Sequence, residues 1–454
     1  MSRYKAYPAY RDSGVEWVGD IPEAWQVTPL FSVASTGVEK NDDGAESNVL
    51  SLSYGRIIRR DVEDNHGLLP ESFNTYQIVD SGDIILRLTD LQNDKRSLRV
   101  GMANEKGIIT SAYLKLTAKA WFLDRYLYRL LHSYDTTKVF YGMGGGLRQS
   151  MKFEEMRRLQ MLCPSLDEQK QIADFLDHET AKIDALIEKQ RRLIELLKEK
   201  RQAVISHAVT KGLNPNAPMK DSGVEWLGEV PAHWEVMQVR RVLLGIEQGK
   251  SPECESRSAD INEWGVLKTG CVNNAIYNSE ENKYLPDRLA PFSQFEVMLG
   301  DVLMSRASGS DDLIGSVAYV HETRPKILLS DKIFRLFVCD GMNKIFFVYL
   351  MRSSFMRTSI KNAISGAEGM ANNITKGAIM AFRFALPSKG EQELIVKFLD
   401  QQLGKFDALI NRSEKAIDLL QERRTALISA AVTGKIDVRD WQPAAAQEEV
   451  GSEC

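Results

Sequence analysis

Arginine, lysine and asparagine side chains gather in glycine-containing loops at several points of this 454-residue chain. In the major groove of DNA, Arg and Lys bind guanine and Asn and Gln bind adenine, while hydroxyl groups contact the backbone. The chemistry that such loops could perform is the reading of base edges. The candidates in the first half of the chain are Tyr54, Arg56, Arg59, Arg60, Arg87, Lys95, Arg96, Arg99, Arg148 and Gln149. Those in the second half are Lys268, Asn273, Asn274, Ser305, Arg306, Asn372, Asn373 and Lys376.

For any one of these residues, a solvated surface position is the simpler interpretation, because exposed Arg and Asn need no function. The sets are stronger evidence than their members. They fall at corresponding points of two segments whose side chains differ, as expected of two readers with different targets.

No motif indicates a catalytic or metal site. Gly245 to Ser251 resembles a phosphate loop, but three residues separate its glycines where the loop needs four. His178 and His321 are each followed by Glu, yet neither has the second histidine that a helical zinc site requires one turn later. We therefore expect no catalytic residue, no bound metal and no cofactor in this chain.

The composition indicates a soluble globular protein. A net charge of −4 gives no general attraction to nucleic acid, although local basic faces remain possible. No window approaches eighteen apolar residues, and the first residues lack the apolar core of a secretory signal. Five scattered cysteines without C-x-x-C spacing favour reduced thiols. We expect the protein in the cytoplasm.

The elements that would position these loops occur twice. Residues 12–25, DSGVEWVGDIPEAW, return at 221–234 as DSGVEWLGEVPAHW, with nine of fourteen positions identical. Residues 164–210 return at 387–433 with 24 of 47 identical. Repeats of this length predict one structural unit used twice, with a pseudo-two-fold relation between the copies.

The 47-residue repeat has the periodicity of a long helix. Ser165 with Glu168, and Ser388 with Glu391, form capping boxes at its start, and Gly212 and Gly434 lie where the two helices should end. About 44 residues make a rod of roughly 65 Å, which needs a partner helix, and the other copy is the obvious one. We predict an antiparallel coiled coil, with Gln190 and Ser413 at equivalent polar positions of its seam. The apolar seam is predicted at Ile172, Leu176, Ile183, Leu186, Leu193, Leu197, Val204, Ile395, Leu399, Phe406, Leu409, Leu420 and Leu427. Amphipathic helices that dock on their own domains are the alternative.

Between the helices, strand-like runs surround one likely helical segment in each insert, near residues 122–134 and 344–360. The fold class is α/β (α+β), with two similar mixed domains separated by the two long helices. The predicted domains are residues 1–160, a helix at 161–213, residues 214–386, a helix at 387–437 and a tail at 438–454.

The repeated D-S-G-V-E-W-x-G-x-x-P-x-x-W motif and the EQ-x-x-I-x-x-FLD…DALI…IS-x-AVT helix, both present twice, closely resemble the specificity subunit of type I restriction-modification enzymes. The likeness covers residues 4 to 441. It implies that each insert is a target-recognition domain and that the paired helices are a spacer and docking platform. Two unlike domains should read an asymmetric bipartite DNA target, with half-sites about one helical turn apart, roughly 10 base pairs.

The resemblance also implies partners. Proteins of this family recruit two modification subunits, which methylate adenine with S-adenosylmethionine, and two restriction subunits driven by ATP with Mg²⁺. The chain itself would be non-catalytic and would not bind a membrane. Two alternatives stay open: a coiled-coil scaffold whose heads bind proteins, and a fused methyltransferase or nuclease, for which no cofactor motif is found.

Overall fold

A computed structural model describes residues 4–61, 72–89, 98–142, 151–364 and 372–443. Its contacts divide the chain into two compact units, which are Met1–Gln190 with Glu414–Cys454, and Arg191–Ser413. Each unit therefore combines one insert with parts of both long helices. The domain boundaries predicted from the sequence instead divide the chain into consecutive segments, and each long helix is one of these segments.

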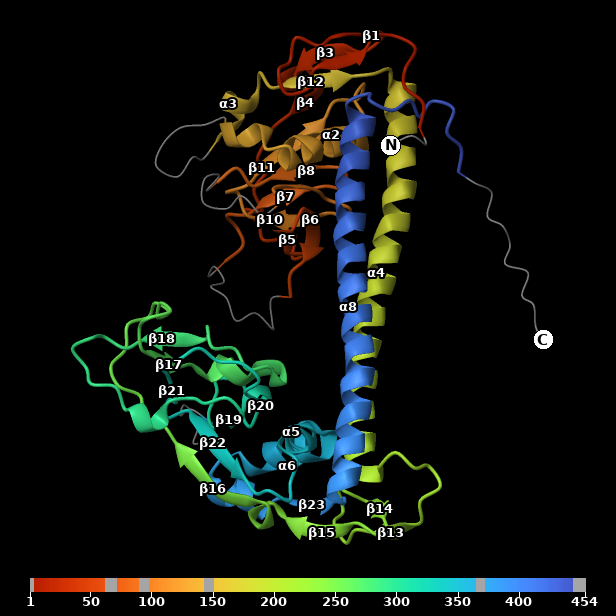
Figure 1. Cartoon of the computed structure of the whole chain (residues 1–454). Helices are drawn as coiled ribbons and strands as arrows, with labels where there is room; N and C mark the ends of the chain where they lie inside the picture. Colours follow the sequence, from red (N-terminus) through yellow and green to blue (C-terminus); the bar gives the residue numbers. More distant parts are fainter. Residues whose placement is uncertain (1–3, 62–71, 90–97, 143–150, 365–371, 444–454) are drawn as a thin grey trace. The chain divides into compact units, whose positions relative to one another are not determined.

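The first unit consists of short antiparallel strands around one buried helix, α2 (Figure 1). Its largest sheet has four strands in the order β4-β11-β8-β9. The strands are β1 (Tyr10–Asp12), β2 (Asp20–Pro22), β3 (Gln26–Pro29), β4 (Ala34–Ser35), β5 (Leu50–Ser53), β6 (Arg56–Arg59), β7 (Gln77–Val79), β8 (Ile84–Leu86), β9 (Val100–Met102), β10 (Gly107–Ile109), β11 (Leu114–Ala118) and β12 (Gln160–Cys163). The helices are α1 (Leu30–Val33), α2 (Asp124–Thr136), η1 (Val139–Gly142), α3 (Phe153–Met156) and the start of α4 (Leu166–Lys211).

The second unit repeats this plan with different side chains. Its main sheet has the order β16-β22-β19-β20, and a smaller sheet has the order β18-β17-β21. The strands are β13 (Met219–Asp221), β14 (Glu229–Pro231), β15 (Glu235–Gln238), β16 (Leu243–Gln248), β17 (Gly265–Leu267), β18 (Asn282–Tyr284), β19 (Val302–Ser305), β20 (Val317–Tyr319), β21 (Ile327–Leu328), β22 (Ile333–Val338) and β23 (Arg383–Leu386). The helices are η2 (Val239–Arg241), η3 (Thr269–Ala275), η4 (Ser293–Phe295), η5 (Asp311–Leu313), α5 (Lys344–Arg352), α6 (Ser354–Ala363), α7 (Lys376–Ala381) and the start of α8 (Lys389–Val432).

Corresponding strands occupy corresponding places in the two units. β1 pairs with β2 as β13 pairs with β14, and β3 pairs with β12 as β15 pairs with β23. The predicted class of two similar mixed domains with long helices is confirmed. The helix predicted at 344–360 is divided at Ser353, whose ψ of 152° is extended, so that α5 ends there and α6 begins.

The repeated tryptophan motif joins the start of one long helix to the end of the other. In the first unit, the Trp25 indole donates to Glu168 Oε1 at 3.0 Å, and Tyr10 Oη donates to the carbonyl of Gly434 at 3.0 Å. In the second unit, the Trp234 indole donates to Glu391 Oε1 at 3.2 Å. A Cβ added to Gly212 would lie 3.2 Å from the Trp234 ring.

The predicted capping box is complete in α8 and only half formed in α4. Both hydrogen bonds of the box are present at the start of α8. The Ser388 backbone donates to the Glu391 carboxylate, and the Glu391 backbone donates to Ser388 Oγ. In α4, the Glu168 backbone donates to Ser165 Oγ at 3.3 Å. The Glu168 carboxylate instead accepts from Tyr7 and Trp25. Gly212 and Gly434 end the helices, each with φ of +72°.

Within each unit the segments of α4 and α8 lie side by side and run in opposite directions (Figure 1). Asp184 pairs with Arg424 at 3.0 Å in the first unit, and Arg201 pairs with Asp407 at 3.2 Å in the second. Asp184 and Asp407 are equivalent repeat positions, as are Arg201 and Arg424. Each ion pair therefore joins the same two positions with the helices exchanged, which an antiparallel pair of repeats requires.

The seam prediction is wrong for three leucines. Leu186, Leu193 and Leu409 are exposed, and Ile187, Ile194 and Ile410 are buried. Each of these leucines is followed directly by an isoleucine, so the helical periodicity is satisfied by either residue. Packing buries the isoleucine and leaves the leucine exposed. The other predicted residues are buried or half-buried, namely Ile172, Leu176, Ile183, Leu197, Val204, Ile395, Leu399, Phe406, Leu420 and Leu427.

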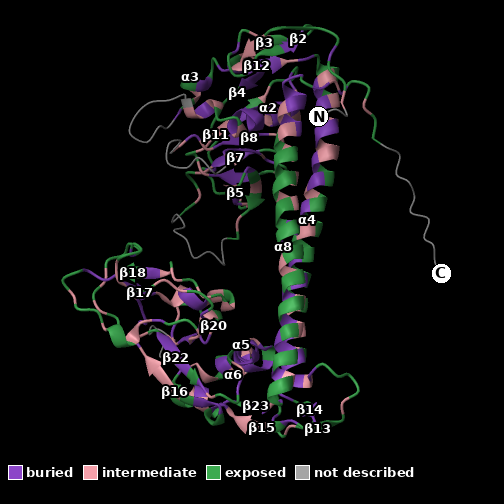
Figure 2. Cartoon of the chain, viewed as in Figure 1, coloured by how far each residue is buried: buried purple, intermediate pink, exposed green. Residues whose placement is uncertain are grey.

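The middle parts of both helices are mainly exposed, whereas their ends are buried in the unit cores (Figure 2). Ser413 is buried and Gln190 is half-buried at the predicted polar positions. Among the described residues, no helix is long and apolar enough to span a membrane.

Candidate nucleic-acid interface

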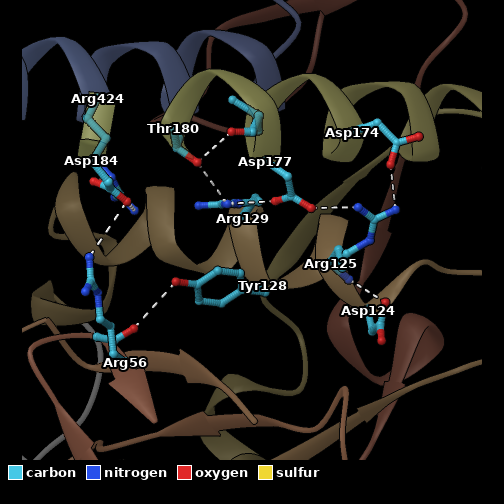
Figure 3. A network of polar contacts seen from close by, with 12 residues as sticks. Arg56, Asp124, Arg125, Tyr128, Arg129, Asp174, Asp177, Thr180, Asp184 and Arg424 are labelled. Atoms are coloured by element: carbon cyan, nitrogen blue, oxygen red, sulfur yellow. Dashed lines mark hydrogen bonds and ion pairs between the residues drawn. The ribbon is translucent and has the colours of Figure 1, made fainter. Parts of the chain in front are cut away.

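An arginine and aspartate network attaches α2 of the first unit to α4 (Figure 3). Arg125 contacts Asp174 and Asp177 at 2.7 and 2.6 Å, and Arg129 contacts Asp177 at 2.7 Å. These ion pairs raise the pKa of Arg125, although burial opposes them. Arg129 is almost completely buried, and Asp177 compensates its charge. This network attaches the first insert to α4.

The second unit replaces this charged contact with a neutral donor. There Tyr349 Oη of α5 donates to Asp400, which is equivalent to Asp177 in the helix repeat. Burial, followed by that hydrogen bond, raises the pKa of Tyr349. The two domains are therefore held at the same repeat position by different chemistry.

The hairpin of β5 and β6 presents the first predicted basic set. Tyr54, at φ of +47°, is 81% exposed at its turn. Arg56 reaches Asp184 at 3.7 Å, and Arg59 forms a bidentate contact with Glu105. A cavity of about 760 Å³ lies beside the hairpin, and its lining includes Arg56, Arg125, Arg129 and Arg424 together with Asp177 and Asp184. Arginines outnumber carboxylates there, so the hairpin and the cavity form a basic face of the first unit.

Other predictions in the first unit have different outcomes. Arg60 and Arg87 are half-buried. Arg99 is completely buried, so the prediction of a DNA contact is wrong for it. Its guanidinium donates to the carbonyls of Arg87 and Thr89 and to Tyr141 Oη. It therefore connects the residues that follow β8 to η1. Lys95, Arg96, Arg148 and Gln149 lie outside the described residues.

Three lysines line a groove of about 450 Å³ in the second unit. Lys268 follows β17, Lys283 lies in β18, and Lys332 precedes β22. Hydroxyls of Ser251 and Thr269 also line the groove, and Asp331 is its only lining carboxylate among the described residues. The excess of ammonium groups over carboxylates makes the groove suited to phosphate oxygens.

Gly249 allows this groove to form. A Cβ at this position would overlap the backbone carbonyl of Leu329, so only glycine fits. The sequence resemblance to a phosphate loop at Gly245 to Ser251 therefore reflects the close approach of two backbone segments. Within the described chain, no cluster of His, Cys, Asp and Glu suits a metal ion.

Ser305 is also a wrong prediction. It is buried, and its hydroxyl donates to the Leu313 carbonyl at 2.6 Å and accepts from the Ser316 backbone at 3.1 Å. These hydrogen bonds stabilise the connection between β19 and β20. Asn274 is exposed at φ of +56° and lines a second cavity, with Arg352 and Arg357.

The remaining candidates of the second unit lie at or near its surface. Asn372 donates to Asp311 at 2.7 Å, and the Lys376 ammonium lies 5.8 Å from the Phe334 ring centroid. Asn273, Arg306 and Asn373 are half-buried. Sequence reasoning missed Lys283 and Lys332, because each is a single lysine, without a glycine-rich loop, 49 positions from the other.

A family model for the type I restriction modification DNA specificity domain matches residues 232–419. This segment is similar to the type I DNA specificity domain. The match includes β15 to β23 and most of α8, and therefore nearly the whole insert of the second unit.

Relatives extend the likeness beyond the specificity domain. The EcoEI specificity subunit of Escherichia coli is 27% identical over 244 residues, which are 53% of this chain and 40% of that protein. The MjaVIII specificity subunit of Methanocaldococcus jannaschii is 26% identical over 80% of this chain and 81% of its own length. The putative MjaX specificity subunit of the same organism is 23% identical over 93% of this chain and 96% of its own. The chain is thus similar over most of its length to proteins named as specificity subunits of type I restriction enzymes.

A solved chain from a study of complex assembly and conformational transition of the type I restriction-modification system shares the fold. It superimposes with a TM-score of 0.60 at 16% identity and covers 91% of this chain and 98% of its own length. The arrangement of two mixed domains with two long helices is therefore a known fold.

Proposed function

We propose that the chain recognises an asymmetric bipartite DNA sequence, with one half-site contacted by each recognition domain. The observation that carries this proposal is the duplicated frame with unlike inserts. The first insert bears an arginine hairpin, and the second bears a lysine groove. Two different basic surfaces on one repeated frame suit two different DNA half-sites separated by an unread gap.

The proposal assigns no chemistry to this chain. The paired helices dock two modification subunits and two restriction subunits, which supply adenine methylation and DNA translocation or cleavage. S-adenosylmethionine, ATP and Mg²⁺ are used by those subunits. A non-catalytic protein scaffold is the second candidate, and the net charge of −4 favours it.

Selection of DNA by the assembled protein distinguishes the two functions. The full chain, assembled with the modification subunit of its host, is incubated with a library of random duplexes, and bound molecules are sequenced. We expect two short conserved blocks with a gap of constant length. Absence of any enriched sequence would favour the scaffold.

The lysine groove provides a variant test of the same proposal. Replacing Lys268 and Lys332 with Ala should weaken DNA binding and reduce the slope of log K against log salt by about 1.8, because each phosphate contact contributes about 0.9. Lys397→Ala, at an exposed site on α8 away from the groove, is the matched control. An unchanged slope in the double variant would remove the groove from the interface.

A further inference from the structure

The cavity beside the β5–β6 hairpin is lined by more guanidinium groups than carboxylates. Among the described residues, its charged lining consists of four arginines and two aspartates, namely Arg56, Arg125, Arg129, Arg424, Asp177 and Asp184. Asp174 lies outside the lining and also pairs with Arg125. Four positive charges therefore meet three negative charges even when Asp174 is included, so this cluster has an excess of positive charge.

Arg129 is the least exposed member of the cluster. Its side chain is 9% exposed, and its Nη2 atom donates to Asp177 at 2.7 Å and to Thr180 at 3.2 Å. Its Nε and Nη1 atoms are buried without a hydrogen-bond partner in the described parts of the chain. The guanidinium also lies 5.3 Å from the centroid of the Tyr128 ring, which is not a hydrogen-bond acceptor of comparable strength. Because buried donors of a charged group are costly to leave unpaired, an acceptor in the cavity would relieve that cost.

Two further guanidinium groups share one carboxylate. Arg424 Nε donates to Asp184 Oδ1 at 3.0 Å. Arg56 approaches Asp184 Oδ2 at 3.7 Å, which is too long for a hydrogen bond, and its side chain is 70% exposed. The two arginines reach Asp184 from opposite sides (Figure 3). The N–H groups of Arg56 are therefore open to a second acceptor.

A neighbouring histidine experiences the same positive surroundings. His132 is buried on α2, close to one helical turn after Arg129. Burial, followed by the charges of Arg424 and Arg129, lowers the pKa of His132 to about 3. Its Nδ1 atom has no hydrogen-bond partner in the described chain. The region thus opposes an additional cation, and an anion would be attracted to it.

Phosphate is the anion that this arrangement suits best. Guanidinium groups bind phosphate oxygens through paired, charge-assisted N–H donors. The cavity of about 760 Å³ has room for a phosphate group together with the substituent that carries it. The exposed side chain of Asn104, which also lines the cavity, offers an amide as a further donor.

We propose that this cavity is a binding site for one phosphate group, held by Arg56, Arg129 and Arg424. A free phosphate and a backbone phosphate of DNA both supply this chemistry, so the site does not require that the chain read a DNA sequence. The three arginines belong to β6, α2 and α8. The bound anion would therefore strengthen the attachment of the first insert to the long helices.

The test is a calorimetric titration of the full chain with orthophosphate, with sodium chloride adjusted to keep the ionic strength constant. We expect one saturable site on the wild-type chain, and a higher melting temperature of the first unit as the site fills. Arg56→Ala should raise the dissociation constant about tenfold or more, because it removes charge-assisted hydrogen bonds. Arg56 is largely exposed, so this variant should fold as the wild type does.

Arg129→Tyr is the second variant. It introduces the residue type by which Tyr349 contacts Asp400 in the second unit, so the attachment to α4 can be kept without the buried cation. It should also weaken phosphate binding about tenfold or more. Arg158→Ala is the matched control, because Arg158 is exposed in the same unit and lies outside the cavity. It should bind orthophosphate as the wild type does.

A duplex of unrelated sequence, added to the phosphate-loaded chain, distinguishes the two sources of the ligand. Displacement of orthophosphate in the wild type would identify a backbone phosphate, and retention would identify a free phosphate; both results support the site. The proposal would be overturned by a titration without saturable binding, by equal affinities in the wild type and both cavity variants, or by an equal loss in Arg158→Ala. Failure of the duplex selection described above would reject the proposed DNA function and leave the orthophosphate result unchanged.

Discussion

Replacing Gly434 with Ala should destabilise the end of α8 more than the equivalent change at Gly212 destabilises the end of α4. Both glycines have φ of +72°, so both substitutions force an L-residue into a left-handed conformation, at about 1–2 kcal/mol. The surroundings differ. A Cβ at Gly434 would overlap the Pro22 ring and lie 3.3 Å from Trp25, whereas a Cβ at Gly212 would lie 3.2 Å from Trp234 with no overlap.

The overlap at Gly434 adds a packing cost of about 1–3 kcal/mol, because a proline ring cannot rotate away. Local opening of the α8 end in G434A should therefore be about 5- to 150-fold more frequent than local opening of the α4 end in G212A. Hydrogen exchange of peptides covering 424–433 and 202–211 measures both ends in the full chain. Equal acceleration at the two ends would refute the contact between Gly434 and the tryptophan motif.

Two further predictions concern the attachment of the helices. Asp177→Asn should lower the free energy of unfolding of the first unit by about 3–5 kcal/mol, because it leaves Arg129 buried without its counter-charge. Asp400→Asn should cost about 1 kcal/mol in the second unit, because Tyr349 is neutral, and equal losses in denaturant titrations would contradict this reasoning. Hydrogen bonds from His233, Trp234 and Ser388 hold the pKa of Glu391 below its ordinary value of 4.5 although burial opposes them. Its contribution to stability is therefore present above pH 4.5 and lost as the pH falls through the folded-state pKa, so amide exchange at residues 389–396 should accelerate there after correction for intrinsic rates, and a pH-independent result would count against it.

The frame was predictable because its signals are local. Helical periodicity, the serine and glutamate caps, and the terminal glycines occur within a few residues of one another, and the repeat confirms each signal by a second copy. The seam register was not fixed in the same way, because Leu193 and Ile194 are both apolar and only packing distinguishes them.

The candidate interface was harder to predict, because burial depends on residues far along the chain. Arg99 is buried because its backbone donates to Asp135, 36 positions away, and its side chain fastens two carbonyls. Lys268, Lys283 and Lys332 form one groove only after three separate strands assemble. Single residues of this kind leave no pattern in the sequence.

The central claim is tested most directly by mapping methylated adenines across the host genome with this gene intact and with it deleted. The account predicts a bipartite motif, with a gap of constant length, that is methylated only when the gene is present. Identical methylation in the two strains, with the modification subunit expressed and active, would contradict it.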